Sequence, residues 1–210
     1  MTAKLLTHGS KTMSLVSNLR PAIISMVLFT LLLGVAYPLG VTAVSQALFP
    51  AQASGSLIRD ASGAIVGSAL IGQNFSGEAY LRPRPSAAGK DGYDATSSSG
   101  SNLGPLNEDL ATRIKTDAEA SRVADGAEPI PPDAVQASAS GLDPHIAPEN
   151  AARQIERTAK ARGIQPLQVA EIVAQNTEGY LLGFIGRPRV NVLTANLALD
   201  ARYPKAQAKP

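Results

Sequence analysis

Histidine is the side chain best suited to proton transfer near neutral pH, and this sequence has only His8 and His145. His145 follows Asp143 by two residues and serines are abundant, so the side-chain types of a Ser-His-Asp hydrolase are present. A simpler interpretation is that residues 142–145 (Leu-Asp-Pro-His) form a turn before a helix beginning at Pro148. We favour the turn and predict no catalytic residue in this chain.

A second candidate is the Ser- and Gly-rich stretch at residues 97–104, which could present consecutive backbone N–H groups and hydroxyls to an anion such as a phosphate. Arg82 and Arg84 could supply positive charge beside it. The alternative is a capped turn before a helix at Leu106, and this is the interpretation that we favour. The candidate nucleotide or partner-contact residues are Ser98, Ser99, Gly100, Ser101, Asn102 and Arg84.

Other chemistry is excluded by motif. The only Gly-Lys pair, Gly89-Lys90, is followed by Asp91, so there is no P-loop, and neither G-x-G-x-x-G, H-E-x-x-H nor G-x-S-x-G occurs. The chain has no cysteine, which rules out disulfides, zinc-thiolate sites and thiol catalysis. We predict no metal site and no cofactor held by this chain alone.

These residues follow a long apolar segment. No charged side chain occurs from Pro21 to Ile58, and its most apolar part is the 23-residue run Ala22–Val44. Such a helix is about 34 Å long, enough to cross a hydrocarbon core of about 30 Å, so we predict a transmembrane helix at residues 21–45. A buried soluble helix is the first alternative. A cleaved signal peptide is the second, because residues 51–53 (Ala-Gln-Ala) have the form of a cleavage site, but signal-peptide apolar regions span only about 7–15 residues.

The charges beside this segment predict its orientation. Lys4, Lys11 and Arg20 precede it without any acidic residue, so the positive-inside rule makes residues 1–20 a basic cytoplasmic arm and places the C-terminal domain in the periplasm, with the helix in the cell inner membrane. The rest of the chain has 16 basic and 17 acidic residues. A nucleic-acid surface needs basic residues clustered on the folded part, so we predict that no nucleic acid is a partner. The predicted span makes the lipid bilayer a partner.

One face of the predicted span carries small residues. Thr30 and Gly34, and then Ala36 and Gly40, are each four residues apart, which allows another helix to approach closely. Pro38 is expected to kink the outer half and to leave one carbonyl without its usual N–H partner. We predict transmembrane packing at Thr30, Gly34, Pro38 and Gly40; the alternative is an ordinary anchor with incidental glycines.

The soluble part, residues 54–200, reads as a small α+β domain, with a flexible tail at 201–210. A hairpin is expected from strands at Ser56–Arg59 and Ala64–Ile71. Residues 78–105 and 125–144 are expected to be irregular, and the segment Val190–Leu199 fits either a strand or a helix. The predicted helices are Leu106–Ala120, Pro148–Arg162 and Pro166–Asn176. The predicted fold is therefore a single N-terminal transmembrane helix plus a small α+β extracytoplasmic domain.

Several segments in order strongly resemble the C subunit of the bacterial Kdp-type potassium-transporting ATPase, over about residues 18–200. They are Leu19–Ala22, Gly67–Phe75, Arg84–Ala87, Gly100–Pro105, Ala137–Pro144, Val190–Leu193 and Asn196–Asp200. Three features depart from the family pattern: Ser99 replaces a glycine, Leu81 replaces an aromatic residue, and the arm at residues 1–17 is longer. A serine at position 99 would be strained if that position needs a positive φ.

The resemblance implies a non-catalytic accessory subunit of an ATP-driven, high-affinity potassium import complex. Its implied partners are a potassium-channel-like subunit and the ATP-hydrolysing P-type subunit. The family is also described as a catalytic chaperone that raises the affinity of the hydrolysing subunit for ATP, which makes ATP an implied ligand.

That role conflicts with the predicted orientation, because ATP is cytoplasmic and the loop at 97–104 would lie outside. We therefore expect the domain to stabilise the complex or to cover the extracytoplasmic ion entrance. Two alternatives remain open: a membrane-anchored extracytoplasmic hydrolase that uses His145, and a tethered binding module.

Overall fold

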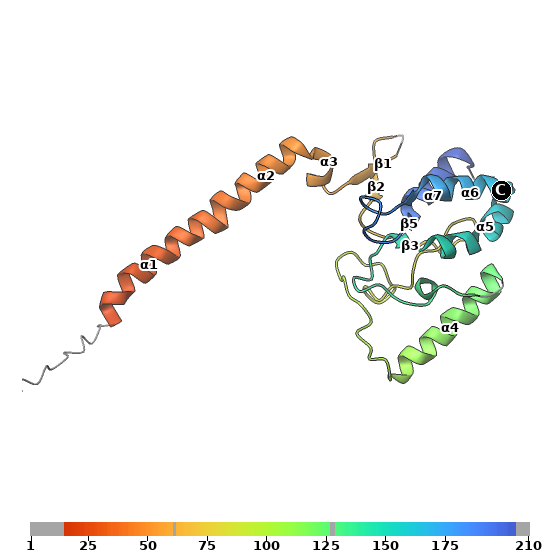
Figure 1. Cartoon of the computed structure of the whole chain (residues 1–210), viewed down its shortest axis with the longest axis horizontal. Helices are drawn as coiled ribbons and strands as arrows, with labels where there is room; N and C mark the ends of the chain where they lie inside the picture. The colour runs from red at the N-terminus through yellow and green to blue at the C-terminus, as the bar shows by residue number, and fades with distance from the viewer. Residues whose placement is uncertain (1–14, 61, 127–128, 205–210) are drawn as a thin grey trace, which may run out of the picture. The chain divides into compact units, whose positions relative to one another are not determined.

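The structure is a computed structural model, and it describes residues 15–60, 62–126 and 129–204. The chain forms two compact units, residues 1–54 and residues 55–210, which are described separately below (Figure 1).

The first unit is dominated by one long helical segment. It consists of α1 (Leu15–Leu31), a π-helical turn η1 (Leu32–Ala36) and α2 (Tyr37–Leu48), followed by the short α3 (Pro50–Ala53). Of these residues, the 31 from Asn18 to Leu48 are apolar enough to cross a membrane, and none of the most apolar stretch is buried. A helix long enough to span is therefore confirmed, and it extends beyond the predicted 21–45 at both ends.

The π-helical turn lies directly before Pro38. Proline lacks an N–H and cannot continue the regular helical ladder. The ladder adjusts here by widening, so that the Tyr37 N–H donates to the carbonyl of Leu32, five residues earlier. The disturbance that the sequence predicted at Pro38 thus takes the form of a π-turn.

The second unit begins with the predicted hairpin, β1 (Leu57–Arg59) and β2 (Ile65–Ser68), which pair antiparallel. The turn between them is organised by Asp60, whose Oδ1 accepts hydrogen bonds from the N–H groups of Ser62 (2.8 Å) and Ala64 (3.0 Å). These bonds hold together the turn of the predicted hairpin.

A second sheet has the order β3-β5-β4, with β3 (His145–Ile146) and β4 (Thr177–Glu178) both antiparallel to β5 (Arg189–Asn191). β5 runs directly into α7 (Val192–Arg202). Asn191 ends the strand and caps the helix, because its Oδ1 accepts from the Thr194 N–H at 3.1 Å. The ambiguous segment 190–199 is thus strand first and helix afterwards.

The core lies where α5 (Pro148–Arg162), α6 (Pro166–Gln175) and α7 pack around β5 (Figure 1). The prediction for α5 is confirmed at both ends, and Gly163 caps it with a φ of +69°. The largest fully buried apolar side chains are Leu81, Ile146, Val169, Ile172, Val190, Val192, Leu193 and Leu199.

Helix α4 (Glu108–Asp125) differs from the other helices of the domain because no residue in it is buried. It begins where Asn107 accepts hydrogen bonds from the N–H groups of Asp109 (2.7 Å) and Leu110 (3.2 Å). The segments on either side, 69–107 and 129–144, are irregular apart from the short 3-10 turn η2 (Pro132–Ala134). The domain is therefore α+β, as the sequence predicts, with slightly more than half of its described residues outside regular elements.

Candidate functional site

The Ser- and Gly-rich loop packs against residues 138–141. The Ser98 hydroxyl donates to the carbonyl of Ser140 at 2.9 Å. A Cβ at Gly100 would lie 2.9 Å from the carbonyl oxygen of Ala139, and one at Gly141 would lie 2.5 Å from that of Ser99. Both glycines are needed because two backbones approach closely here. The loop is thus one side of a backbone-to-backbone contact.

The departure at Ser99 causes no backbone strain. Among the described non-glycine residues with positive φ, Asn102 is the one in this loop, at +52°, and asparagine tolerates this conformation. Within the described residues, the N–H groups of residues 98–102 have no intramolecular hydrogen-bond partner. They are oriented by the loop and remain available to water or to a ligand.

Arg84 contacts the same segment, residues 136–143, and its guanidinium group is already bound by other groups of the protein. Its Nη1 is 3.1 Å from Asp143 Oδ2, and its Nε donates to the carbonyl of Gln136 at 3.3 Å. Tyr93 donates its hydroxyl to the Arg84 carbonyl at 2.6 Å. The structure therefore places both Arg84 and the 98–102 loop against residues 136–143, with the arginine committed to Asp143 rather than turned toward an anion.

Asp143 is the electrostatic centre of this cluster. Burial acts to raise its pKa, but hydrogen bonds from His145 and the positive charge of Arg84 outweigh it, so the pKa is held below the ordinary 3.8. Burial and the nearby Asp143 carboxylate raise the pKa of Tyr93, which stays protonated. The cluster consequently fixes an ionised carboxylate between Arg84 and His145.

His145 does not form a hydrolytic triad with the serines of the described chain. Its Nδ1 is 3.2 Å from Asp143 Oδ1, as a triad would require, but its Nε2 lies 4.0 Å from Glu178 Oε1. No described serine hydroxyl bonds to the ring. A nucleophile must be within hydrogen-bond reach of its base. The geometry favours the turn interpretation, since the His145 N–H also donates to Asp143 Oδ1 at 3.0 Å.

A cavity of about 400 Å³ opens between α4, the start of α5 and the irregular segment 74–93. Arg84 lines it, but the 98–102 loop does not, so the structure does not unite the predicted anion site around one cavity. Three carboxylates, Asp91, Asp117 and Asp125, face this space. Burial raises the pKa of Asp117 despite the lowering influence of Arg113. Arg82 and Arg84 also line the cavity, but carboxylates outnumber them, so the lining offers no excess of positive charge for a triphosphate.

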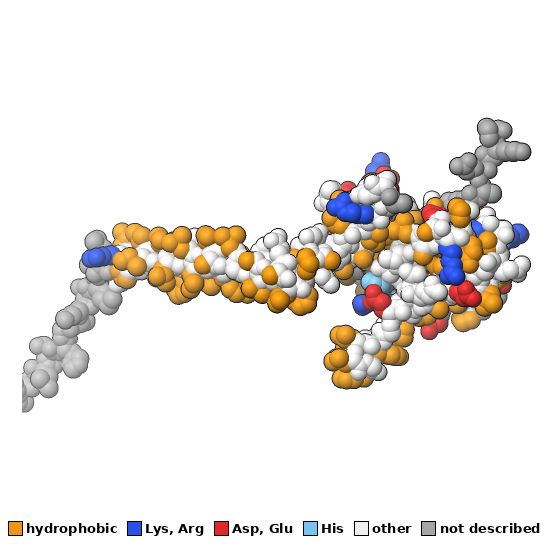
Figure 2. Space-filling model, turned by 90° about the horizontal axis from the view of Figure 1, so that it is seen from above, with side chains coloured by type: hydrophobic (Ala, Val, Ile, Leu, Met, Phe, Trp, Pro, Cys, Tyr) orange, Lys and Arg blue, Asp and Glu red, His pale blue; other side chains and the backbone are white. Residues whose placement is uncertain are grey.

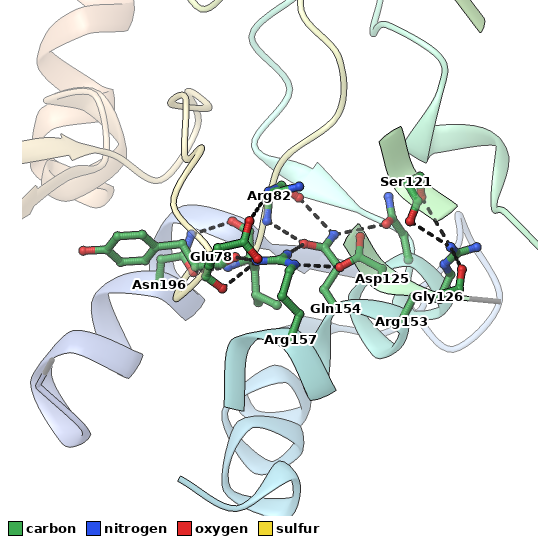
Figure 3. A network of polar contacts seen from close by, with 12 residues as sticks. Glu78, Arg82, Ser121, Asp125, Gly126, Arg153, Gln154, Arg157 and Asn196 are labelled. Atoms are coloured by element: carbon green, nitrogen blue, oxygen red, sulfur yellow. Dashed lines mark hydrogen bonds and ion pairs between the residues drawn. The ribbon is translucent and has the colours of Figure 1, made fainter. Parts of the chain in front are cut away.

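The strongest polar feature was not predicted. Side chains of α5 and α7 bind the backbone of residues 78–82, which forms a turn at 77–80 and then continues as irregular chain (Figure 3). We call the four side chains Gln154, Arg157, Arg162 and Asn196 the backbone clamp.

Two members of the clamp are amides that each satisfy one backbone residue twice. Asn196 accepts from the Leu81 N–H at 2.9 Å and donates to its carbonyl at 2.8 Å. Gln154 does the same for Arg82, at 2.6 and 3.1 Å. Buried backbone groups outside a sheet need such partners, and here an amide side chain replaces the missing strand.

The two arginines complete the clamp. Arg157 donates to the carbonyls of Glu78 (2.6 Å) and Tyr80 (2.9 Å) and pairs with Asp125 at 2.7 Å, with both side chains almost fully buried. Arg162, whose side chain has no exposed area, donates to the Ala79 carbonyl at 2.6 Å. The clamp thereby positions Leu81 in the core and fixes the start of the segment that carries Arg84.

A sequence signal for the clamp exists but is ambiguous. Asn150, Gln154 and Arg157 recur at helical spacing on α5, which normally marks a solvent-facing stripe. Only the position of residues 78–82 above that stripe shows that it is buried.

The predicted membrane-packing residues all lie on the helical segment of the first unit. Thr30, Gly34, Pro38 and Gly40 are exposed there, and a Cβ added at Gly40 would meet nothing within 4 Å. This is the geometry that a close helix partner requires; helix packing at these residues stays a prediction.

Comparison with known proteins covers both units. The family model described as "KdpC: K+-transporting ATPase, c chain" matches residues 19–201. A potassium-transporting ATPase KdpC subunit of Caulobacter sp. (strain K31) is 60% identical over 190 residues, covering 90% of this chain and 96% of the relative. The corresponding subunit of Geobacter sulfurreducens is 51% identical over 187 residues, covering 89% and 99%. The chain therefore belongs to the KdpC family, the c chain of the K+-transporting ATPase.

Proposed function

We propose that this protein is a non-catalytic accessory subunit of an ATP-driven, high-affinity potassium import complex, in which it supports assembly and stability. Membership in the c-chain family implies a potassium uptake complex. The observation that carries the proposal is the extent of the match. The family model covers both the long apolar helix and the domain that follows it, so both parts of the chain correspond to parts of the family's subunit.

The partners we propose are the channel-like subunit and the ATP-hydrolysing P-type subunit. The span supplies one contact through the small residues Thr30 and Gly34, which share a face, and Gly40 further along, since small residues allow helices to pack closely in lipid. The domain supplies the other, and its irregular segment at residues 78–82 is already fixed by the backbone clamp and does not have to order on binding.

We further propose that the domain lies in the periplasm, with the N-terminus in the cytoplasm and the helix in the inner membrane. The basic arm supports this orientation. An increase in the ATP affinity of the hydrolysing subunit, the chaperone role implied by the family, would then be transmitted through subunit contacts. The committed state of Arg84 and the acidic cavity lining favour this indirect route over direct ATP binding.

Complementation tests the assignment. In a bacterium lacking its own c-chain gene, expression of this protein with its cognate transporter subunits is expected to restore growth when K+ is scarce and to change nothing when K+ is plentiful. Unimpaired high-affinity uptake without the c chain would contradict the proposed role.

The orientation is testable because the chain has no cysteine. Single cysteines at Lys90 and Ser98 are expected to react in intact cells with a maleimide that cannot cross the inner membrane, once the outer membrane is permeabilised. A cysteine at Lys4 is the matched control and should react only after lysis. The reverse pattern would restore direct ATP contact as a hypothesis.

A further inference from the structure

The loop between β4 and β5 exposes the largest group of apolar side chains in the domain. Five large side chains occur within six residues, with exposed fractions between 46% and 76%: Tyr180, Leu181, Leu182, Phe184 and Ile185. We call them the apolar hairpin. Figure 2 shows exposed hydrophobic side chains on the domain near the pale-blue histidine, and the Nε2 of His145 lies 4.0 Å from Glu178 Oε1, just before this loop. Exposed apolar groups of this size mark interaction surfaces.

The hairpin is folded rather than loose. Leu181 and Ile185 exchange both backbone hydrogen bonds at 2.9 Å, and the N–H groups of Gly183 and Phe184 donate to Tyr180 and Leu181. Because these four N–H groups are satisfied within the hairpin, a partner that covers it leaves fewer backbone groups to be paired than it would over an unfolded loop.

Leu182 at the tip has a backbone conformation that favours other residues. Its φ is +53°, in the left-handed region where glycine and asparagine are preferred and a leucine is strained. Its side chain is 76% exposed, so packing within the domain does not repay this cost. Strain of this kind persists at functional sites, which indicates that the leucine side chain is needed for a contact outside the domain.

The hairpin lies at the end of the domain where the chain enters. The second unit begins at Gly55, β1 starts at Leu57, and Leu57 pairs with Ser68. The carbonyl of the next residue, Ala69, accepts from Asn191 at the end of β5, the strand that leads out of the hairpin, at 2.9 Å. Within the second unit, the hairpin strand β5 is therefore joined to the segment by which the chain enters the domain.

Two arginines follow the apolar residues. Arg189 pairs with Glu178 at 2.6 Å, whereas Arg187 is exposed and makes no ion pair within the described residues. Tyrosine, phenylalanine and arginine are the types enriched in protein–protein contact centres. A surface that binds anionic lipid would instead carry a cluster of basic residues, which this loop lacks.

We infer that the apolar hairpin docks on the extramembrane face of a membrane-spanning subunit of the same transporter, in an apolar hollow with an acidic group facing Arg187. This inference rests on the proposed function and specifies the surface of contact. The hairpin tip supplies the buried anchors, and Arg187 supplies orientation.

The decisive variants are Leu182→Asn and Phe184→Ser, made in the full chain and co-expressed with the other subunits of the transporter. Asparagine suits the conformation at position 182, so Leu182→Asn is expected to leave thermal unfolding unchanged or slightly higher. Recovery of the partner subunits through a tag on this chain is expected to fall about tenfold, the effect of losing one interface anchor. Leu106→Asn is the matched control, because Leu106 is 96% exposed and lies outside the hairpin.

A cysteine at Leu181 carrying a benzophenone identifies what covers the hairpin. Cross-linking to a transporter subunit supports the inference, whereas cross-linking to lipid alone overturns it. Undiminished co-purification of both hairpin variants also overturns it. If the wild-type chain itself fails to co-purify or to restore K+-limited growth, the proposed function is what fails.

Discussion

Helices α4 and α5 are similar in length, with 18 and 15 residues, and both are rich in charged side chains. In α5 seven residues are buried, among them Asn150, Gln154, Arg157 and Arg162, whereas no residue of α4 is buried as a whole, although the side chain of Asp125 at its C-terminal end is nearly covered. The difference comes from the chain beside them, because residues 78–82 lie against α5 and need hydrogen-bond partners. Polar composition therefore does not tell whether a helix faces water; the neighbouring backbone decides it.

The attachment of α4 is also uneven. Its C-terminal end is held by Arg153, which donates to the carbonyls of Gly126 (3.0 Å) and Pro129 (2.8 Å), and by the pair of Asp125 with Arg157. At its other end the helix has the cap at Asn107, and no ion pair joins its first turn to the rest of the domain as far as the described residues show. We expect substitutions in α5 to unfold the domain and those in α4 to have local effects.

The largest effect is expected at Arg157. Replacing it by leucine leaves the buried Asp125 carboxylate and the carbonyls of Glu78 and Tyr80 without their partner. Breaking a buried pair on one side costs about 3–5 kcal/mol, to be measured by denaturant unfolding of the chain in detergent. Lys115→Ala, on the exposed surface of α4, is the control and should stay within about 0.5 kcal/mol. A similar loss in both variants would refute the contrast.

Asn196 is the next most sensitive position. Asn196→Ala removes both hydrogen bonds to Leu81 inside the core, and two unsatisfied backbone groups together cost about 2–4 kcal/mol. The same unfolding measurement applies. A loss below about 1 kcal/mol would mean that water replaces the amide.

A smaller loss is expected at the start of α4. Asn107→Ala removes the acceptor that caps the N–H groups of Asp109 and Leu110, and it should lower the free energy of opening the start of α4 by about 1 kcal/mol. Asn107→Asp keeps the acceptor and should lower it little. If α4 unfolds locally, hydrogen exchange will rise in residues 108–114 without a change in global unfolding. Increased exchange in α5 would contradict the separate behaviour of the two helices.

Two aspartates, Asp143 in the loop before β3 and Asp117 on α4, are expected to change the stability of the domain in opposite directions as the pH is lowered. The folded-state pKa of Asp143 is lowered, so the unfolded chain binds a proton more readily and the contribution of Asp143 to stability is present above pH 3.8 and lost as pH falls through the folded pKa. The gap in unfolding free energy between wild type and Asp143→Asn should therefore shrink as pH is lowered from 6 toward 3. A gap that is constant with pH would contradict this.

Asp117 on α4 gives the opposite sign and the smallest effect. Its pKa is raised by burial, so its contribution is present below pH 3.8 and lost as pH rises through the folded pKa. The change in unfolding free energy caused by Asp117→Asn is expected to be equal or slightly more stabilising at pH 7 than at pH 3. A loss of stability at pH 7 would show that the pair with Arg113 dominates over burial.

Most regular elements were predictable from local patterns. The span, the β1–β2 hairpin and the bounds of α5 follow from apolar length, turn residues and caps that lie within a few positions of one another. The helix predicted at 106–120 exists as α4, but it begins at Glu108 and ends at Asp125, and Leu106 lies outside it with 96% of its surface exposed. Periodicity fixes which residues share a face and does not say what covers that face.

The candidate site was predictable only in part. The sequence singled out Arg84 and residues 98–102, and the structure places both against residues 136–143, yet it pairs Arg84 with Asp143 and leaves the loop outside the cavity. The contacts of Arg84 with Asp143 and of Ser98 with Ser140 join residues that are 59 and 42 positions apart in the sequence, and no local pattern encodes such contacts.

By itself the sequence determined that this chain has a membrane-spanning helix followed by a small α+β domain and that it resembles the c-chain family, because apolar length, helix caps and ordered motifs are properties of neighbouring residues. Only the tertiary structure decided that the polar stripe of α5 is a buried clamp and that His145 faces Glu178 rather than a serine. It also decided that Tyr180–Ile185 form an exposed apolar tip. The physical reason is common to all three: burial and hydrogen bonding depend on which distant segment lies alongside, and that is settled when the whole domain packs.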